Sequence, residues 1–124
     1  MKLGIVGTRR RNEDMIKFIL QGYIDEFKPD MIVSGGCQRG ADRFAEELAR
    51  QLSIPILILY PKIPAHYAPR YVWIQAYYER NRRIAEESDA LVAVVADDRR
   101  GGTENTIKWF KELKPQNTLV EVSE

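Results

Sequence analysis

Residues 32–42 read Ile-Val-Ser-Gly-Gly-Cys-Gln-Arg-Gly-Ala-Asp, an apolar run that ends in glycines and leads into a helical pattern. In α/β proteins a strand, a glycine turn and a helix often hold an anion, because backbone N–H groups at the helix start have no partner within the helix. The spacing is Gly-Gly-x-x-x-Gly, which is neither the dinucleotide fingerprint nor a Walker A loop. By itself the motif supports a phosphate loop and a tight turn equally.

The chain has 124 residues, 44% hydrophobic and 30% charged, which predicts one globular domain over residues 1–124. No apolar run approaches the roughly 20 residues that span a bilayer, and no signal-peptide pattern is present, so we expect a cytoplasmic protein without a membrane partner. The single cysteine, Cys37, and the single histidine, His66, are too few for a typical metal site. We therefore expect no metal and no cofactor.

Arginines gather in three short segments although the formal net charge is only +1. The segments lie at residues 9–11, 80–83 and 99–100. Local positive charge without an overall excess favours a small anionic ligand over a long nucleic acid. For any single arginine, however, a solvated position balanced by a nearby carboxylate is the more common outcome.

Five apolar runs alternate with helical patterns, which predicts an α/β fold with a parallel sheet. The expected strands are residues 3–6, 31–33, 56–59, 90–95 and 118–122, and the expected helices are 16–27, 41–52, 71–87 and a last one ending near 113. The run 56–59 is apolar throughout, which is typical of a central strand covered on both faces. Right-handed crossovers predict a three-layer, Rossmann-like fold with strand order 3-2-1-4-5.

Glycine turns follow the first, second and fourth apolar runs, so all three are expected at one edge of the sheet. Open α/β sheets bind ligands where the strand order reverses, here between the first and fourth strands. The side chains near these turns are mostly hydrogen-bond donors, and a phosphate offers only acceptors. The predicted phosphate-binding residues are Gly7, Thr8, Arg9, Ser34, Gly35, Gly36, Arg39, Gly40, Asp42, Arg80, Asn81, Gly101, Gly102 and Thr103.

Some of the polar residues near the turns have a purely structural interpretation. We expect Asn12 and Asp42 to cap helices, and Thr103 fits a cap as well as a ligand contact. Arg80 and Asn81 are expected to lie partly against the sheet, because each shares a helix face with an apolar residue four positions later.

Six of the twelve aromatic residues lie between residues 60 and 78. They could stack on a base, but aromatic residues on a helix more often belong to a core or to an interface.

Four motifs occur in order: Gly-Thr-Arg at 7–9, Ser-Gly-Gly-Cys-Gln-Arg-Gly-Ala-Asp at 34–42, Arg-Asn at 80–81 and Gly-Thr-Glu-Asn-Thr-Ile at 102–107. Together they resemble the compact, single-domain nucleotide-sensor branch of the SLOG superfamily, Rossmann-like domains that include the LOG phosphoribohydrolases and the DNA-processing protein A core. The resemblance covers almost the whole chain. It implies a nucleoside phosphate or an ADP-ribose-like ligand, with its phosphate on the Gly102–Thr103 turn.

The resemblance also identifies a departure from the LOG enzymes. There a glutamate in the last motif acts with an arginine of the upstream helix to cleave an N-glycosidic bond, and the matching residues here are Thr106 and Arg80. A threonine cannot replace a carboxylate in that chemistry. If the chain does hydrolyse a nucleotide, the expected catalytic residues are Arg80 with Glu104 or Asp42.

The sequence therefore predicts a domain that binds a phosphorylated nucleotide or a nucleotide-derived ligand. The alternatives are N-glycosidic hydrolysis of a nucleoside phosphate, single-stranded nucleic-acid binding by the aromatic and basic segment 60–83, and a purely structural role. The superfamily resemblance implies pairing through helices, and the aromatic stretch 71–78 would suit a homodimer or a higher homo-oligomer.

Overall fold

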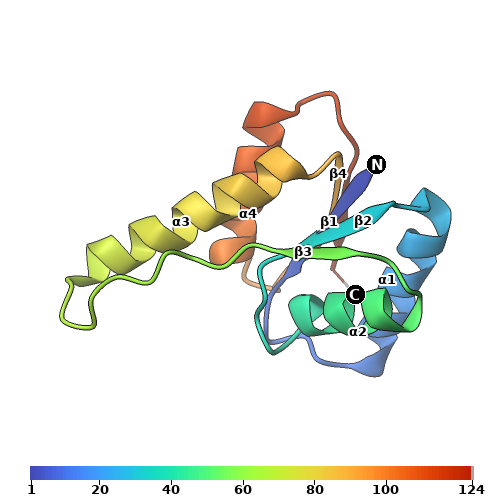
Figure 1. Ribbon diagram of the computed structural model, residues 1–124, viewed down its shortest axis with the longest axis horizontal. Coiled ribbons are helices and arrows are strands. Elements are labelled where there is room, and N and C mark those ends of the chain that lie inside the picture. Colours follow the sequence, from blue (N-terminus) through green and yellow to red (C-terminus); the bar gives the residue numbers. More distant parts are fainter. Residues whose placement is uncertain (124) are drawn as a thin grey trace.

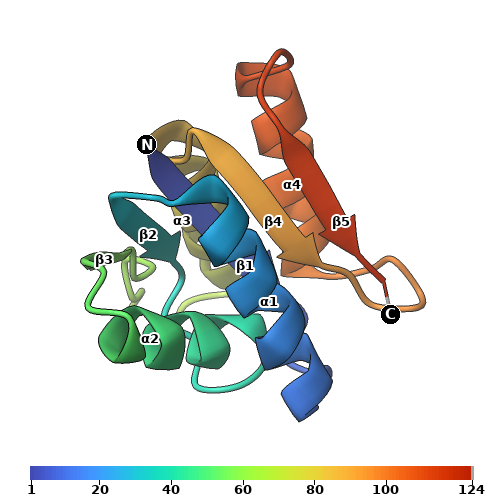
Figure 2. The ribbon, with the colours of Figure 1, turned by 90° about the vertical axis from the view of Figure 1, so that its right-hand side faces the viewer.

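The computed structural model describes residues 1–123 as a five-stranded, all-parallel sheet with two helices on each face (Figures 1 and 2). The strand order is β3-β2-β1-β4-β5, which confirms the predicted Rossmann-like fold and its order. The elements are β1 (Lys2–Gly7), α1 (Asp14–Phe27), β2 (Met31–Ser34), α2 (Ala41–Gln51), β3 (Ile56–Ile58), α3 (Arg70–Glu87), β4 (Ala90–Val94), α4 (Gly102–Leu113) and β5 (Leu119–Val122).

Apolar side chains fill the two spaces between the sheet and its helices. On one face, Leu20 of α1 and Phe44 of α2 pack against Ile5 and other strand residues. On the other face, Ile84 of α3 and Phe110 of α4 close a second cluster. The strands supply both layers because successive side chains point to opposite faces. This arrangement fixes the carboxyl ends of all five strands along one edge.

The third apolar run forms an edge strand, as the predicted strand order places it, although an entirely apolar run is more typical of a central strand. β3 pairs with β2 alone, through registers such as Val33 with Leu57, and its three residues are only half-buried. Ile56 packs on the layer of α1 and α2, while Leu57 packs on the layer of α3 and α4. Helices that cover both faces explain an entirely apolar strand without a neighbour on its outer side.

Helix α3 extends well beyond the sheet (Figure 1). Its buried residues are Asn81, Ile84 and Ala85, all in its C-terminal half. In the projecting half, Tyr71 is 64% exposed and Tyr78 is 47% exposed, so of the two expected places for the aromatic residues, a core or an interface, these tyrosines do not occupy the core. Among residues 1–123, no helix combines the length and the apolar character needed to cross a membrane.

Candidate functional site

The three glycine turns lie at the carboxyl ends of neighbouring strands. Gly7 closes β1 and pairs in register with Val94 at the end of β4, so the two strands end together at the point where the strand order reverses. Gly35 and Gly36 follow β2, and Gly101 follows β4 by a short turn. The predicted binding residues are therefore brought to one edge of the sheet, as α/β sites require.

The first turn is held by Thr8, which is 9% exposed. Its backbone N–H donates to the carbonyl oxygen of Val94 at 3.0 Å, and its Oγ1 accepts from the backbone N–H of Arg10 at 3.2 Å. Arg9 and Arg10 are both exposed, but the side chain of Arg10 turns back toward Thr8, with Nε 3.4 Å from Thr8 Oγ1. Arg9 is among the predicted binding residues and Arg10 is not, because nothing in a run of three arginines shows which one bonds to the neighbouring turn.

The turn that joins β2 to α2 satisfies much of its own hydrogen bonding. The N–H of Cys37 donates to Oδ2 of Asp42 at 3.0 Å, and the N–H of Gly36 lies 3.4 Å from Ser34 Oγ. These N–H groups are among those that the glycine motif would offer to a phosphate. In this conformation the turn is a scaffold held together by Ser34 and Asp42.

Asn12 and Asp42 do not cap helices, so both capping predictions are wrong. The N-cap residues of α1 and α2 are Glu13 and Gly40, and neither helix has a side-chain cap bond. Asn12 instead accepts the N–H of Gly40 at 2.7 Å across 28 residues, which ties the first turn to the second. Gly40 has φ of 68°, and a Cβ there would collide with the Thr8 carbonyl oxygen. Glycine is required at this crossing of two backbones.

Asp42 is the buried carboxylate of the site, with 8% of the residue exposed. Burial raises its pKa to about 6 from an ordinary 3.8, against the opposing effects of the Cys37 N–H, the charge of Arg80 and the Ser34 side chain. A carboxylate in this position titrates near neutral pH, where general acid and base groups operate.

Arg80 reaches from α3 to the second turn. Its Nη1 donates to the Gly35 carbonyl oxygen at 2.7 Å, and its Nε donates to Oδ1 of Asn81 at 3.0 Å. Burial lowers the pKa of Arg80, and the nearby carboxylate of Asp42 acts in the opposite direction. A Cβ on Gly35 would lie 2.9 Å from Nη1 of Arg80 and 3.2 Å from Oδ2 of Asp42. The missing side chain at Gly35 leaves room for this pair of charges.

Asn81, the next residue of α3, contacts the third glycine turn. It is 5% exposed, and its Nδ2 lies 3.3 Å from the Gly102 carbonyl oxygen and 3.3 Å from Oδ1 of Asn105. The expectation that Arg80 and Asn81 lie against the sheet is confirmed. Together these adjacent residues connect the turns that follow β2 and β4.

The N-terminus of α4 is open. A Cβ added to Gly101, whose φ is 114°, would meet no atom within 4 Å, and one on Gly102 would meet only Asn81 Nδ2 at 3.5 Å. Gly101 is the N-cap and provides no side-chain acceptor for the first turn of the helix. Thr103 lies inside the helix, so the capping alternative for Thr103 is wrong. The first N–H groups of α4 are available to an anion.

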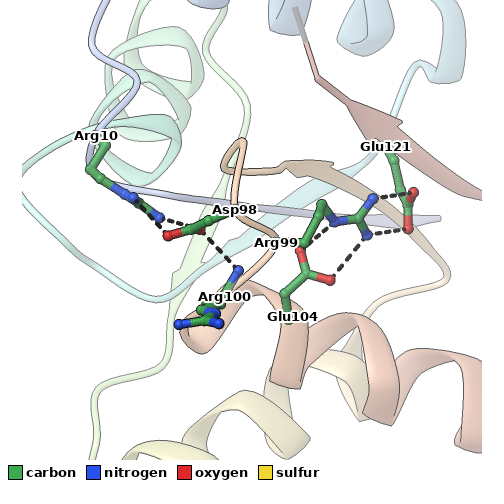
Figure 3. A network of polar contacts seen from close by, with 6 residues as sticks. All are labelled: Arg10, Asp98, Arg99, Arg100, Glu104 and Glu121. Carbon is green, nitrogen blue, oxygen red and sulfur yellow. Dashed lines mark hydrogen bonds and ion pairs between the residues drawn. The ribbon is translucent and has the colours of Figure 1, made fainter.

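Glu104, one of the candidate catalytic residues, is engaged elsewhere. Its Oε2 and Oε1 accept hydrogen bonds from Nε and Nη2 of Arg99 at 2.9 and 3.0 Å, and Arg99 also holds Glu121 of β5 (Figure 3). Thr106 is 2% exposed and donates through Oγ1 to the Gly102 carbonyl oxygen at 3.2 Å. The carboxylate nearest to Arg80 by these contacts is therefore Asp42.

Over residues 1–123, no group of three or more histidine, cysteine, aspartate or glutamate side chains could hold a metal ion. A comparison of the sequence with models of known protein families and with curated proteins finds no significant match.

Proposed function

We propose that this domain binds a phosphorylated nucleotide or a nucleotide-derived ligand where the strand order reverses, with a phosphate on the Gly101–Thr103 turn. The observation that carries the proposal is the turn itself, in which Asn81 Nδ2 donates to the Gly102 carbonyl oxygen at 3.3 Å while a Cβ at Gly101 would meet no atom within 4 Å. Helix N–H groups and the positive end of the helix dipole would hold the phosphate. Arg80, whose Nε donates to Oδ1 of Asn81, supplies positive charge at the same edge of the sheet.

The turn of residues 34–40 has a different role in this proposal. Several of its N–H groups are already bonded to Ser34, Asp42 and Asn12, so it positions Arg80 and Asp42 more than it cradles phosphate. The open turn at the start of α4 is the stronger phosphate site. This division agrees with the resemblance to the SLOG superfamily, which we retain as part of the proposal together with a cytoplasmic location.

Binding is favoured over N-glycosidic hydrolysis because Glu104 is bound to Arg99 and Thr106 is not an acid. Hydrolysis stays the second candidate on the strength of Asp42, a buried carboxylate with a pKa near 6 beside Arg80. Release of free base from 5′-AMP, abolished by Asp42→Asn and kept in Glu104→Gln, would favour the hydrolase. Loss of activity in Glu104→Gln alone would contradict this use of Asp42.

The test of binding places a carboxylate at the proposed phosphate site without disturbing the fold. Thr103→Glu adds a negative charge to the first turn of α4, where acidic residues stabilise a helix by about 0.3–1 kcal/mol. We expect Thr103→Glu to melt no lower than the parent protein yet to lose binding of 5′-AMP in calorimetry. Gln116→Glu adds the same charge in the exposed turn after α4 and should bind as the parent does. Equal binding by Thr103→Glu would exclude the site.

Small molecules that stay bound to the protein through purification give an independent test of nucleotide binding. Mass spectrometry of the material released on denaturation should show a compound with a phosphate ester on a nucleoside. Recovery of the same compound from Thr103→Glu would contradict the proposed site.

The projecting half of α3 is proposed as a homodimer interface. Tyr71, Ile74 and Tyr78 are exposed at helical spacing and continue the face that Asn81 and Ala85 bury against the body. Two such stripes crossing antiparallel about a two-fold axis would place each Tyr71 opposite a second copy's Tyr78. A second copy would thereby cover the exposed aromatic rings.

A further inference from the structure

Arg10 and Asp98 form a bidentate ion pair between the turns that follow β1 and β4 (Figure 3). Nη2 of Arg10 lies 2.9 Å from Oδ1 of Asp98, and Nη1 lies 3.2 Å from Oδ2. The side chains are 57% and 48% exposed, respectively. The hydrogen bonds from Arg10 lower the pKa of Asp98, so the carboxylate is ionised at neutral pH.

The pair crosses the point where the strand order reverses. Thr8 connects Arg10 to the end of β4 through its N–H bond to Val94, and Asp98 follows Val94 by four residues. Oδ1 of Asp98 also accepts the backbone N–H of Arg100 at 3.1 Å. A carboxylate therefore sits where a guanidinium fork and a backbone N–H converge, next to the glycine turn proposed to hold phosphate.

The turn between β4 and α4 is also held by a second set of ion pairs, centred on Arg99. Arg99 holds the carboxylates of Glu104 and Glu121 with four hydrogen bonds, and it adopts a left-handed φ of 53°. Because this clamp faces β5, the turn stays attached to the body when the bond between Arg10 and Asp98 opens. Release of Asp98 would therefore free one carboxylate without releasing α4.

We infer that Arg10 is a ligand-binding residue and that Asp98 occupies its guanidinium when no ligand is present. The inference rests on the proposed nucleotide site and adds to it a competition between two anions. The guanidinium group donates two parallel hydrogen bonds to a carboxylate or to a phosphate in the same bidentate geometry, so a ligand phosphate can take the place of Asp98. An exposed ion pair of this kind contributes little free energy, so replacing Asp98 by a phosphate costs little.

The inference makes opposite predictions for the two partners. Asp98→Asn removes the competing charge and should tighten binding of 5′-AMP, by roughly two- to fivefold given the weakness of exposed ion pairs. Arg10→Gln removes the guanidinium and should weaken binding. In the double variant, Asp98→Asn should bring no gain, because its effect acts through Arg10.

Binding of 5′-AMP to the four proteins, measured by calorimetry at one salt concentration, tests this thermodynamic cycle. Asp97→Asn is the matched control, since it removes the same charge one residue away and should change affinity less than Asp98→Asn. Unchanged or weaker binding by Asp98→Asn overturns the inference. An equal gain in the Arg10→Gln background also overturns it, because that result indicates general repulsion and not competition for one guanidinium.

The same measurements separate this inference from the proposed function. If the parent protein binds 5′-AMP and Asp98→Asn binds it equally, the competition is wrong while the nucleotide site stands. If neither the parent nor Asp98→Asn binds 5′-AMP or inorganic phosphate, the nucleotide site and the competition built on it are both wrong. Thermal unfolding of each variant shows whether any loss comes from the fold.

Discussion

Nη1 of Arg80 donates a hydrogen bond to the carbonyl oxygen of Gly35 at 2.7 Å, across 45 residues of sequence. The bond joins the middle of a helix on one face of the sheet to the turn that leads into a helix on the other face. It forms because Gly35 has no Cβ, which would stand 2.9 Å from the same Nη1. The glycine of the motif thus makes room for a guanidinium from the same chain.

Arg80→Lys should keep the positive charge and lose the shape that satisfies Gly35. A lysine ammonium cannot bond the Gly35 carbonyl and Asn81 at once in the way the planar fork does. We expect the free energy of unfolding in urea to fall by about 1–2 kcal/mol and binding of 5′-AMP to weaken. Arg82→Lys, at an exposed position of the same helix, should change neither quantity measurably. Equal stability of the two variants would contradict a structural role for the bond.

Asp42 should make stability depend on pH. Its pKa in the folded protein is about 6, above the ordinary 3.8, so the folded state takes up a proton that the unfolded state releases between these values. The stabilisation by protonation is complete below pH 3.8 and is lost as the pH rises through 6. Relative to Asp42→Asn, the parent should gain about 1 kcal/mol between pH 7 and pH 5 in urea unfolding. A difference between the two proteins that stays constant with pH would exclude this burial effect.

The order of the strands could be predicted from the pattern of apolar residues along the sequence. Alternating apolar runs and helical periods predicted the strand order and the common edge for Gly7, Gly35 and Gly102, because crossover handedness leaves few topologies. β3 lies at the edge that this order predicts, although its apolar run alone is typical of a central strand. Its uninterrupted apolar residues look the same in an edge strand covered by helices on both faces as in a central strand.

The contacts of the site could not be read from the sequence. Asn12 and Asp42 stand next to helix starts, which predicts capping, yet both accept N–H groups of the turn between β2 and α2. The donor to Asp42 is Cys37, five residues earlier, whereas Asn12 accepts from Gly40, 28 residues away. The bond between Arg10 and Asp98 spans 88 residues, and no local pattern distinguishes Arg10 from Arg9. Periodicity reports which face a residue takes in its own element, whereas the partners of Asn12 and Arg10 lie in distant segments of the chain.

Gly40 and Gly22 should respond oppositely to alanine. Gly40 combines a φ of 68° with a Cβ position blocked by the Thr8 carbonyl, so Gly40→Ala should lower the free energy of unfolding by about 2–4 kcal/mol. Gly22 lies exposed within α1 with no atom near its Cβ position, and Gly22→Ala should raise stability by about 0.5–1 kcal/mol. Urea unfolding of both variants decides the matter. A tolerated Gly40→Ala would mean that the two turns can separate without cost.

The exposed stripe on α3 should determine the oligomeric state. If a second copy covers Tyr71 and Tyr78, light scattering should report a dimer for the parent and a monomer for the Tyr71→Ser, Tyr78→Ser double variant, since aromatic rings dominate interface energies. Phe18→Ser removes an aromatic side chain that is 75% exposed on α1 and should leave the dimer intact. A monomeric parent would contradict the interface. Salt-sensitive binding of a single-stranded oligonucleotide by that monomer, lost in the tyrosine variant, would instead assign the stripe to nucleic acid.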